Sequence, residues 1–293
     1  MTKTAWVFPG QGSQAIGMGV DLATEAKAKV KFEQAKEILG WDVLKICQSQ
    51  EDKLSHTIYT QPSLYVVETI LADLIRERGN RPNLVAGHSL GEYVALYVAG
   101  VFDFESGLNL VKRRAELMDS AAGGMMAALI GFNREQLDAE IQQTDDVVLA
   151  NDNSPTQVVI SGTPTAVEEV LGKVKAKRIV KLNVSGAFHS PLMAPAAAEF
   201  QEILASVSFR DAEIPVLSNV EPLPATDASI LKDRLQQQMT GNVRWREISL
   251  QLPEEGIEKV VEIGPGKVLT GLIKRICPKL VLENISSLAD IAT

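Results

Sequence analysis

The segment from Leu84 to Ala99 constrains the fold more than any other part of the chain. Its apolar start, Leu84-Val85-Ala86, predicts a short buried strand, and its apolar end, Glu92 to Ala99, has helical spacing. Between them stands Gly87-His88-Ser89-Leu90-Gly91, in which small residues on both sides of Ser89 permit a sharp turn. A strand, a tight turn and a helix in succession predict an α/β fold, hydrolase-like, with Ser89 at the edge of a parallel sheet.

A second, smaller unit is expected inside this domain. Strand signals at 5–8, 214–218 and 259–263 assign residues 1–123 and 191–293 to the large α/β domain with the parallel sheet. The intervening residues 124–190 have the order βαββαβ, which is that of the ferredoxin-like split motif. The strands expected there cover 126–130, 147–150, 157–161 and 178–184, and the helices cover 133–143 and 164–176.

Composition disfavours several classes of function. The chain has 29 Lys and Arg against 37 Asp and Glu, a net charge of −8, so nucleic acid is not an expected partner. The long uncharged run 182–198 contains Asn, His and two prolines, and is not expected to cross a membrane. No secretory signal is recognised, and Cys47 and Cys277 resemble neither a metal-ligand pattern nor a disulfide framework. We therefore expect a cytoplasmic protein, or one of a plastid stroma, without a bound metal.

Ser89 is a candidate nucleophile, and a serine nucleophile needs a base. The following helix puts the amide of Leu90 at a helix N-terminus, where it can stabilise an oxyanion. A glycine-tightened turn with an ordinary helix-cap serine explains the local pattern equally well. Of the three histidines, His88 adjoins Ser89 and its side chain diverges, and His56 lies in a polar stretch. His189 therefore remains as the candidate base, with a structural histidine as the alternative.

Arg114 occupies an unusual place on the helix expected around residues 104–121. At about 100° per residue, Arg114 falls inside the arc that Leu108 and Val111 mark, whereas Lys112 and Arg113 fall outside it. A guanidinium that faces the interior needs a partner. A structural carboxylate is the commoner partner, and a carboxylate of the substrate, held by two parallel hydrogen bonds, is the other.

Two glycine-rich loops admit other chemistry. Gly10-x-Gly12-x-x-Ala15 matches the dinucleotide fingerprint, but such a unit needs a second buried strand, for which only 41–44 is available. A dinucleotide-binding oxidoreductase is therefore a less favoured alternative. Gly264-Pro265-Gly266-Lys267 lacks the spacing of a phosphate-binding loop and is expected to be a strand-to-helix turn.

Five short segments stand in a fixed order over almost the whole chain. They are Phe8-Pro-Gly-Gln-Gly-Ser-Gln14, Tyr59-Thr-Gln-Pro62, Gly87-His-Ser-Leu-Gly-Glu92, Gly186-Ala-Phe-His-Ser190 and Glu262-Ile-Gly-Pro-Gly-Lys-Val-Leu-Thr-Gly271. Together they resemble the malonyl-CoA:acyl carrier protein transacylases of fatty acid synthesis. The resemblance implies an acyltransferase that moves malonyl from malonyl-CoA to the phosphopantetheine thiol of holo-acyl carrier protein through a Ser89 acyl-enzyme, with ping-pong kinetics.

The same resemblance implies the roles of single residues. Ser89 would be the acylated nucleophile and His189 its base, in agreement with the elimination above. The backbone amides of Gln11 and Leu90 would form the oxyanion hole, and Arg114 would bind the malonyl carboxylate.

Further positions are implied with less detail. The family orients its histidine through a backbone carbonyl, and the matching stretch Asn242-Val-Arg-Trp245 assigns this contact to Arg244, where the family often has Gln. Asn151 and Asn153 match an asparagine-rich turn that lines the family's cleft. At Leu90 and Phe188 the chain resembles the malonyl-selective members of the family. A bulky Phe188 would leave less room for the α-methyl group of a methylmalonyl substrate, and this steric exclusion is worth about 1–3 kcal/mol.

The implied partners are acyl carrier protein and a coenzyme A thioester. No permanently bound cofactor is expected, and a monomer is expected. Because both substrates are anionic, a local basic patch is predicted, with Lys267, Lys274 and Arg275 as candidates. The nearest alternative is a serine thioesterase or other hydrolase with water as acceptor, although an α/β-hydrolase would have its histidine late in the chain.

Overall fold

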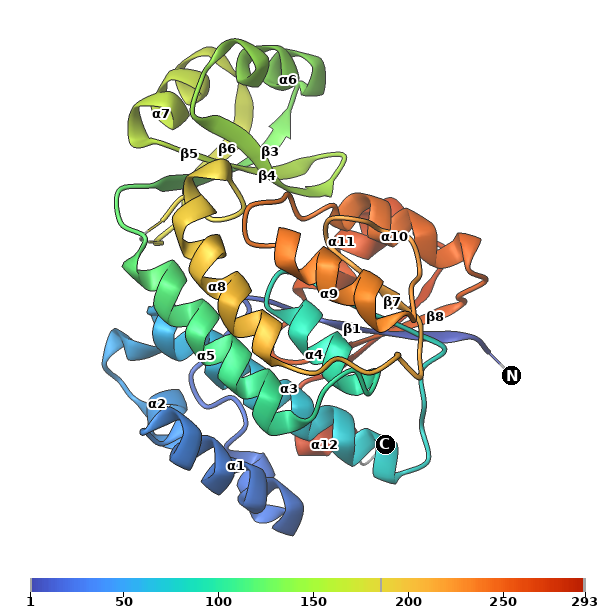
Figure 1. Ribbon diagram of the computed structural model, residues 1–293. Coiled ribbons are helices and arrows are strands. Elements are labelled where there is room, and N and C mark those ends of the chain that lie inside the picture. The colour runs from blue at the N-terminus through green and yellow to red at the C-terminus, as the bar shows by residue number, and fades with distance from the viewer. Residues whose placement is uncertain (1, 185, 292–293) are drawn as a thin grey trace.

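The structure, a computed structural model, describes residues 2–184 and 186–291 (Figure 1). It contains a parallel sheet of five strands in the order β7-β2-β1-β8-β9 and an antiparallel sheet of four strands in the order β4-β5-β3-β6. The predicted α/β fold with a parallel sheet is confirmed. The strands of the larger sheet are β1 (Thr4–Phe8), β2 (Leu84–Gly87), β7 (Val216–Leu217), β8 (Lys259–Ile263) and β9 (Val281–Ile285).

Side chains of β1 alternate between two cores, as expected for a strand buried on both faces. Trp6 and Phe8 join a large core on one side, whereas Ala5 and Val7 join a smaller core on the other. The larger core takes apolar residues from α1 (Ala26–Leu39), α2 (Val43–Gln48), α3 (Thr57–Glu77), α4 (Gly91–Val98), α5 (Phe104–Ser120), α8 (Ala194–Ser206), α9 (Ala228–Gln237) and α12 (Leu288–Ile291). The smaller core takes them from α10 (Trp245–Glu254) and α11 (Val268–Ile276).

The antiparallel sheet has a core of its own. It comprises β3 (Met125–Phe132), β4 (Val147–Ser154), β5 (Gln157–Gly162) and β6 (Ala176–Lys181), with α6 (Arg134–Gln143) and α7 (Pro164–Lys173). Ala127 and Leu129 pack with these helices, which lie on the outer side of the sheet in Figure 1. Met126 and Ala128 point the other way, into the large core. The element order along 125–181 is therefore the predicted βαββαβ.

Strand β4 joins the two parts of the molecule. Asn151 forms a parallel bridge with Val243, and the Asp152 amide donates to the Val243 carbonyl over 3.0 Å. The buried carboxylate of Asp152 accepts from Arg134 of α6 and Arg246 of α10, both over 3.1 Å. Main-chain and charged contacts thus hold the small sheet beside the strand ends of the large one.

Several predicted boundaries are wrong by a few residues. The apolar, helically spaced residues 62–78 predict a helix that begins at Pro62. The helix begins at Thr57 instead, because the extended backbone of His56 supplies its N-cap and Pro62 is accommodated inside the helix. The last strand of the small sheet covers 176–181 instead of 178–184, because its pairing with β3 begins at Ala176. The helical spacing of residues 21–39 predicts a single helix there. The structure has a 3-10 helix, η1 (Asp21–Thr24), followed by α1, since Glu25 between them is extended.

The second strand that a dinucleotide-binding unit would need is not formed. Residues 41–44 lead into helix α2, capped by the side chain of Asp42, which accepts from the amide of Lys45. The chain continues through a further 3-10 helix, η2 (Asp52–Ser55), into α3 without a strand. The turn predicted at 264–267 does connect β8 to α11.

Within residues 2–184 and 186–291, each helix is too short or too polar to pass through a lipid bilayer.

Candidate active site

Ser89 lies in a strained turn between β2 and α4. Its φ of 52° is in the left-handed region, which few residues other than glycine adopt. A Cβ on Gly87 would come within 1.9 Å of the Gly91 carbonyl carbon, and a Cβ on Gly91 would come within 2.0 Å of the Phe8 carbonyl oxygen. These two positions need glycine because backbones touch there, and the tight turn carries the serine out beyond the strand end.

Ser89 and His189 form a hydrogen-bonded pair. Ser89 Oγ lies 2.8 Å from His189 Nε2, and His189 Nδ1 lies 2.9 Å from the Gln238 carbonyl oxygen and 3.2 Å from that of Gly241. Because carbonyl oxygens only accept, Nδ1 carries the proton and Nε2 is free to accept from the serine hydroxyl. The histidine chosen by elimination is therefore in the protonation state that a general base requires.

The histidine-orienting contact is not at Arg244, and the prediction for that residue is wrong. The Arg244 amide donates to the Asn219 carbonyl, and its side chain pairs with Glu247 on the first turn of α10. The carbonyls that reach His189 belong to the end of α9 and the turn after it. Carbonyls at a helix C-terminus have no partner within the helix and are free to accept from a side chain.

Arg114 is fully buried beside the nucleophile. Its Nη2 donates to Ser89 Oγ over 2.9 Å and to Gln238 Oε1 over 3.1 Å, and its Nη1 donates to Gln61 Oε1 over 2.7 Å. The guanidinium carbon lies 5.4 Å from the centre of the Tyr93 ring. No carboxylate of the described residues forms an ion pair with it. The inward-facing cation predicted from the helical pattern thus has neutral hydrogen-bond partners and, within the described part of the chain, no direct counter-ion.

The amides of Gln11 and Leu90 lie on two loops that approach each other. A Cβ on Gly10 would fall 2.4 Å from the His88 carbonyl oxygen and 3.6 Å from the Leu90 nitrogen, so the 10–11 loop runs against the Ser89 turn. Neither amide donates to a carbonyl or side chain in the described part of the chain. Two free N–H groups beside a serine hydroxyl are the arrangement that stabilises a developing oxyanion.

A cleft of about 210 Å³ lies over the serine, between the two sheets. Its walls contain most of the residues that the sequence singled out, namely Gln11, Ser89, Asn151, Asn153, Phe188 and His189. Asn153 Oδ1 lies 2.8 Å from His88 Nε2, so the His88 ring is bound to Asn153, whereas the buried Oδ1 of Asn151 has no partner among the described residues. Met126, Ala128 and Val159 of the small sheet give the cleft an apolar side.

Sequence reasoning assigned no role to three polar residues beneath this cleft. Gln61 and Gln238 hold Arg114, and Glu92 accepts from the side chain of Gln238 over 2.7 Å. Gln61 and Glu92 lie inside two of the segments that carry the family resemblance, and this position could have pointed to a role for both residues. Gln238 stands in an unremarkable polar helix end, 124 residues from Arg114.

The electrostatic surroundings keep His189 uncharged. Burial, and after it the positive charge of Arg114, lower the pKa of His189 from 6.5 to about 3, against the opposing effect of the two carbonyl contacts. Only the neutral imidazole can act as the base. His189 therefore keeps this ability at pH values well below those at which an exposed histidine is protonated.

The lowered pKa of His189 predicts how the rate of reaction at Ser89 depends on pH on the acid side. The rate at which a neutral serine-directed phosphonate modifies Ser89 should stay on its plateau as pH falls from 7 to about 5, where an exposed histidine would already be protonated. A neutral reagent avoids titration of a substrate carboxylate. Circular dichroism at each pH verifies that the protein stays folded, and a rate that halves near pH 6.5 would contradict the assignment.

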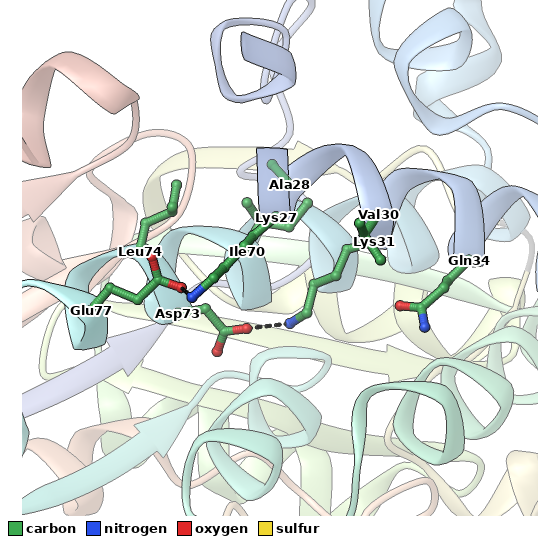
Figure 2. Close-up of a pocket in the computed structure, with 9 residues that line it drawn as sticks. All are labelled: Lys27, Ala28, Val30, Lys31, Gln34, Ile70, Asp73, Leu74 and Glu77. Carbon is green, nitrogen blue, oxygen red and sulfur yellow. Dashed lines mark hydrogen bonds and ion pairs between the residues drawn. The ribbon is translucent and has the colours of Figure 1, made fainter. Parts of the chain in front are cut away.

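A second cavity, of about 270 Å³, lies between α1 and α3 (Figure 2). Its charged side chains pair with one another, Lys27 with Glu77 and Lys31 with Asp73. Gln34 at its edge donates to Glu105. Because these groups already satisfy each other, the cavity offers less to a charged substrate than the cleft at Ser89.

Comparisons with known proteins agree with one another. A family profile described as the acyl transferase domain matches residues 5–287. The malonyl CoA-acyl carrier protein transacylase of Synechocystis sp. is 60% identical over 289 residues, 99% of each chain. A crystal structure of the malonyl-CoA:ACP transacylase from that organism matches with a TM-score of 0.98 at 59% identity over 99% of both chains. A malonyl-transacylase solved in complex with a holo type II polyketide acyl-carrier protein matches with a TM-score of 0.94 at 37% identity, over 100% of this chain and 98% of that one.

Proposed function

The chain belongs to the acyl transferase domain family, and from that premise we propose that it transfers malonyl from malonyl-CoA to the phosphopantetheine thiol of an acyl carrier protein. The observation that carries this proposal is the buried guanidinium of Arg114, 2.9 Å from Ser89 Oγ and without a carboxylate partner in the described residues. A cation beside a nucleophile favours an acyl group that brings its own carboxylate.

The first half-reaction acylates the serine. His189 Nε2 takes the Ser89 proton as Oγ attacks the thioester carbonyl, and the amides of Gln11 and Leu90 stabilise the tetrahedral oxyanion. When the intermediate collapses, the carbon–sulfur bond breaks and His189 returns the proton to the coenzyme A thiolate. The malonyl group is then joined to Ser89 as an ester.

The second half-reaction runs the same steps with another thiol. His189 takes the proton of the phosphopantetheine thiol, whose sulfur attacks the ester carbonyl, and the proton passes to Ser89 Oγ as the carbon–oxygen bond breaks. Arg114 holds the malonyl carboxylate throughout, exchanging its contact with the serine for one with the substrate. Phe188 limits the room beside the α-carbon of the malonyl group. Asn151 and Asn153 contact the substrate along the cleft.

The choice of acceptor separates this function from a serine hydrolase. With Ser89 preloaded with malonyl, addition of holo-carrier protein should discharge the enzyme at least about 100-fold faster than water alone, as a productive acceptor thiol does in ping-pong catalysis. The apo-carrier, which lacks the phosphopantetheine thiol, is the matched control. An acyl-enzyme that decays to malonate at one rate, with or without holo-carrier, would contradict transfer and support hydrolysis.

We also propose the finer description of the fold. The order β4-β5-β3-β6 with both helices on one face supports a ferredoxin-like unit over 124–190, inserted in a hydrolase-like α/β domain formed by 1–123 and 191–293. Residues 1, 185 and 292–293 of these ranges lie outside the described residues. The exposed Lys267, Lys274 and Arg275 on and before α11 remain candidates for carrier docking. The free thiols of Cys47 and Cys277 support a reducing compartment, such as the cytoplasm.

A further inference from the structure

A layer of buried polar side chains lies directly under the catalytic pair. Glu92, on the first turn of α4, accepts through Oε2 from Gln238 Nε2 over 2.7 Å and from the Asn219 amide over 3.2 Å. Asn219 in turn donates to the Gly87 carbonyl and accepts from the Ser89 amide over 2.7 Å. The layer therefore contacts the serine turn from below.

Gln238 is the one side chain of this layer that also contacts Arg114. Its Oε1 accepts from the guanidinium over 3.1 Å, while its Nε2 donates to Glu92 over 2.7 Å and to the Ser89 carbonyl over 2.8 Å. A carboxamide has an acceptor end and a donor end, so it can bridge a cation and an anion. A carboxylate or an ammonium at this position could satisfy only one of the two neighbours.

The two side chains that this bridge joins are a guanidinium and a carboxyl group, and both are buried. Glu92 Oε2 accepts from two N–H donors, an arrangement that favours the ionised carboxylate. Arg114 is 0% exposed and Glu92 is 1% exposed. A buried cation with no counter-charge is strongly disfavoured, yet a carboxylate bound directly to the guanidinium would occupy the donors that a malonyl group needs. Burial raises the pKa of Glu92, and the contacts with Gln238 and Asn219 together with the charge of Arg114 oppose that shift.

We propose that the side chain of Gln238 is a positioning residue that sets acyl selectivity by keeping Glu92 one side chain away from Arg114. In this arrangement Glu92 compensates the buried cation through the bridge, and the guanidinium stays available to the carboxylate of the substrate. The inference rests on the proposed function, because it explains how Arg114 remains selective for a malonyl group. It also gives Gln238 a second role, beside the backbone carbonyl that contacts His189.

A charge-swap variant tests this arrangement with the net charge unchanged. In Glu92→Gln with Gln238→Glu, the carboxylate moves onto Arg114 and the amide takes its former place. We expect acylation of Ser89 by malonyl-CoA to fall about 10- to 100-fold, the size of a lost charge-assisted contact. Acylation by acetyl-CoA, which brings no carboxylate, should change less than about threefold.

The single variant Glu92→Gln is the matched control, because an amide oxygen can still accept from Gln238. This variant removes the counter-charge and keeps the bridge. The ratio of malonyl to acetyl acylation should therefore stay the same or rise, whereas the swap should lower it. A purely structural role would lower both acylation rates in both variants. Modification of Ser89 by a serine-directed phosphonate reports whether each variant retains a folded site.

The outcomes separate the two proposals. If the swap variant keeps the wild-type ratio of malonyl to acetyl acylation, the role of Gln238 is overturned. The proposed function is unaffected by that result as long as malonyl-CoA acylates the wild-type chain. If the swap variant does not fold, a fall of the malonyl-to-acetyl ratio in Glu92→Gln alone overturns the inference, and a maintained or raised ratio supports it. A wild-type chain that malonyl-CoA does not acylate at all would overturn the proposed function, and this inference with it.

Discussion

Replacement of Ser89 or His189 by alanine is expected to reduce malonyl transfer by at least about 10⁴-fold, and the double variant should lose no more than either single variant. The two side chains act as one unit, since Ser89 Oγ lies 2.8 Å from the nitrogen that accepts its proton. Once the hydroxyl is gone the base has nothing to deprotonate, and without the base the hydroxyl is a weak nucleophile. Single-turnover acylation by malonyl-CoA measures both steps separately from carrier binding.

His88→Gln is the comparison variant for these measurements. His88 adjoins the nucleophile in sequence, but its ring contacts Asn153 and Trp245, away from Ser89 Oγ. It should lose far less activity than His189→Ala. If His189→Ala kept acylation within about tenfold of the wild type, less than a general base ordinarily contributes, His189 would not be the base.

Replacement of Arg114 by alanine is the second large effect. Malonyl transfer should fall by about 10²-fold or more, the cost of losing charge-assisted hydrogen bonds to a carboxylate, while activity on neutral acyl groups should rise relative to malonyl. The reason is that three neutral acceptors now hold this guanidinium, and a substrate carboxylate is its natural replacement partner. Steady-state kinetics with malonyl-CoA and acetyl-CoA give the ratio directly.

Arg114→Lys is the informative control for that experiment. It keeps the positive charge but loses the planar fork of donors, so its malonyl activity should fall between the wild type and the alanine variant. Because removal of a buried arginine also unpairs Gln61 and Gln238, thermal unfolding of each variant is measured in parallel. Unchanged malonyl kinetics in the folded alanine variant would contradict the role of Arg114.

Local patterns predicted the parts of the fold that short-range chemistry determines. The turn at Ser89 follows from two glycines and a serine between apolar runs, and β8 follows from a short run in which Val260, Val261 and Ile263 are apolar. The inward direction of Arg114 follows from helical periodicity, because its neighbours along the helix face are apolar. In each case the residues that decide the structure lie within one element.

Contacts between distant segments were the part that could not be read locally. His189 is oriented by carbonyls 49 and 52 residues away, and any residue has a carbonyl, so no side-chain identity marks the position. The resemblance led to Arg244 for this contact, a few residues from the end of α9 where the acceptors lie. Gln238 likewise meets Arg114 and Ser89 only because the fold places the end of α9 beside the turn that follows β2.

The mass of the intact protein after mixing with malonyl-CoA tests the central claim, that Ser89 carries the acyl group, most directly. The wild type should gain one malonyl group that holo-carrier protein removes, and Ser89→Ala should gain none under the same conditions. A malonyl adduct of equal size on Ser89→Ala, or a wild-type chain that remains unmodified by malonyl-CoA, would contradict the account.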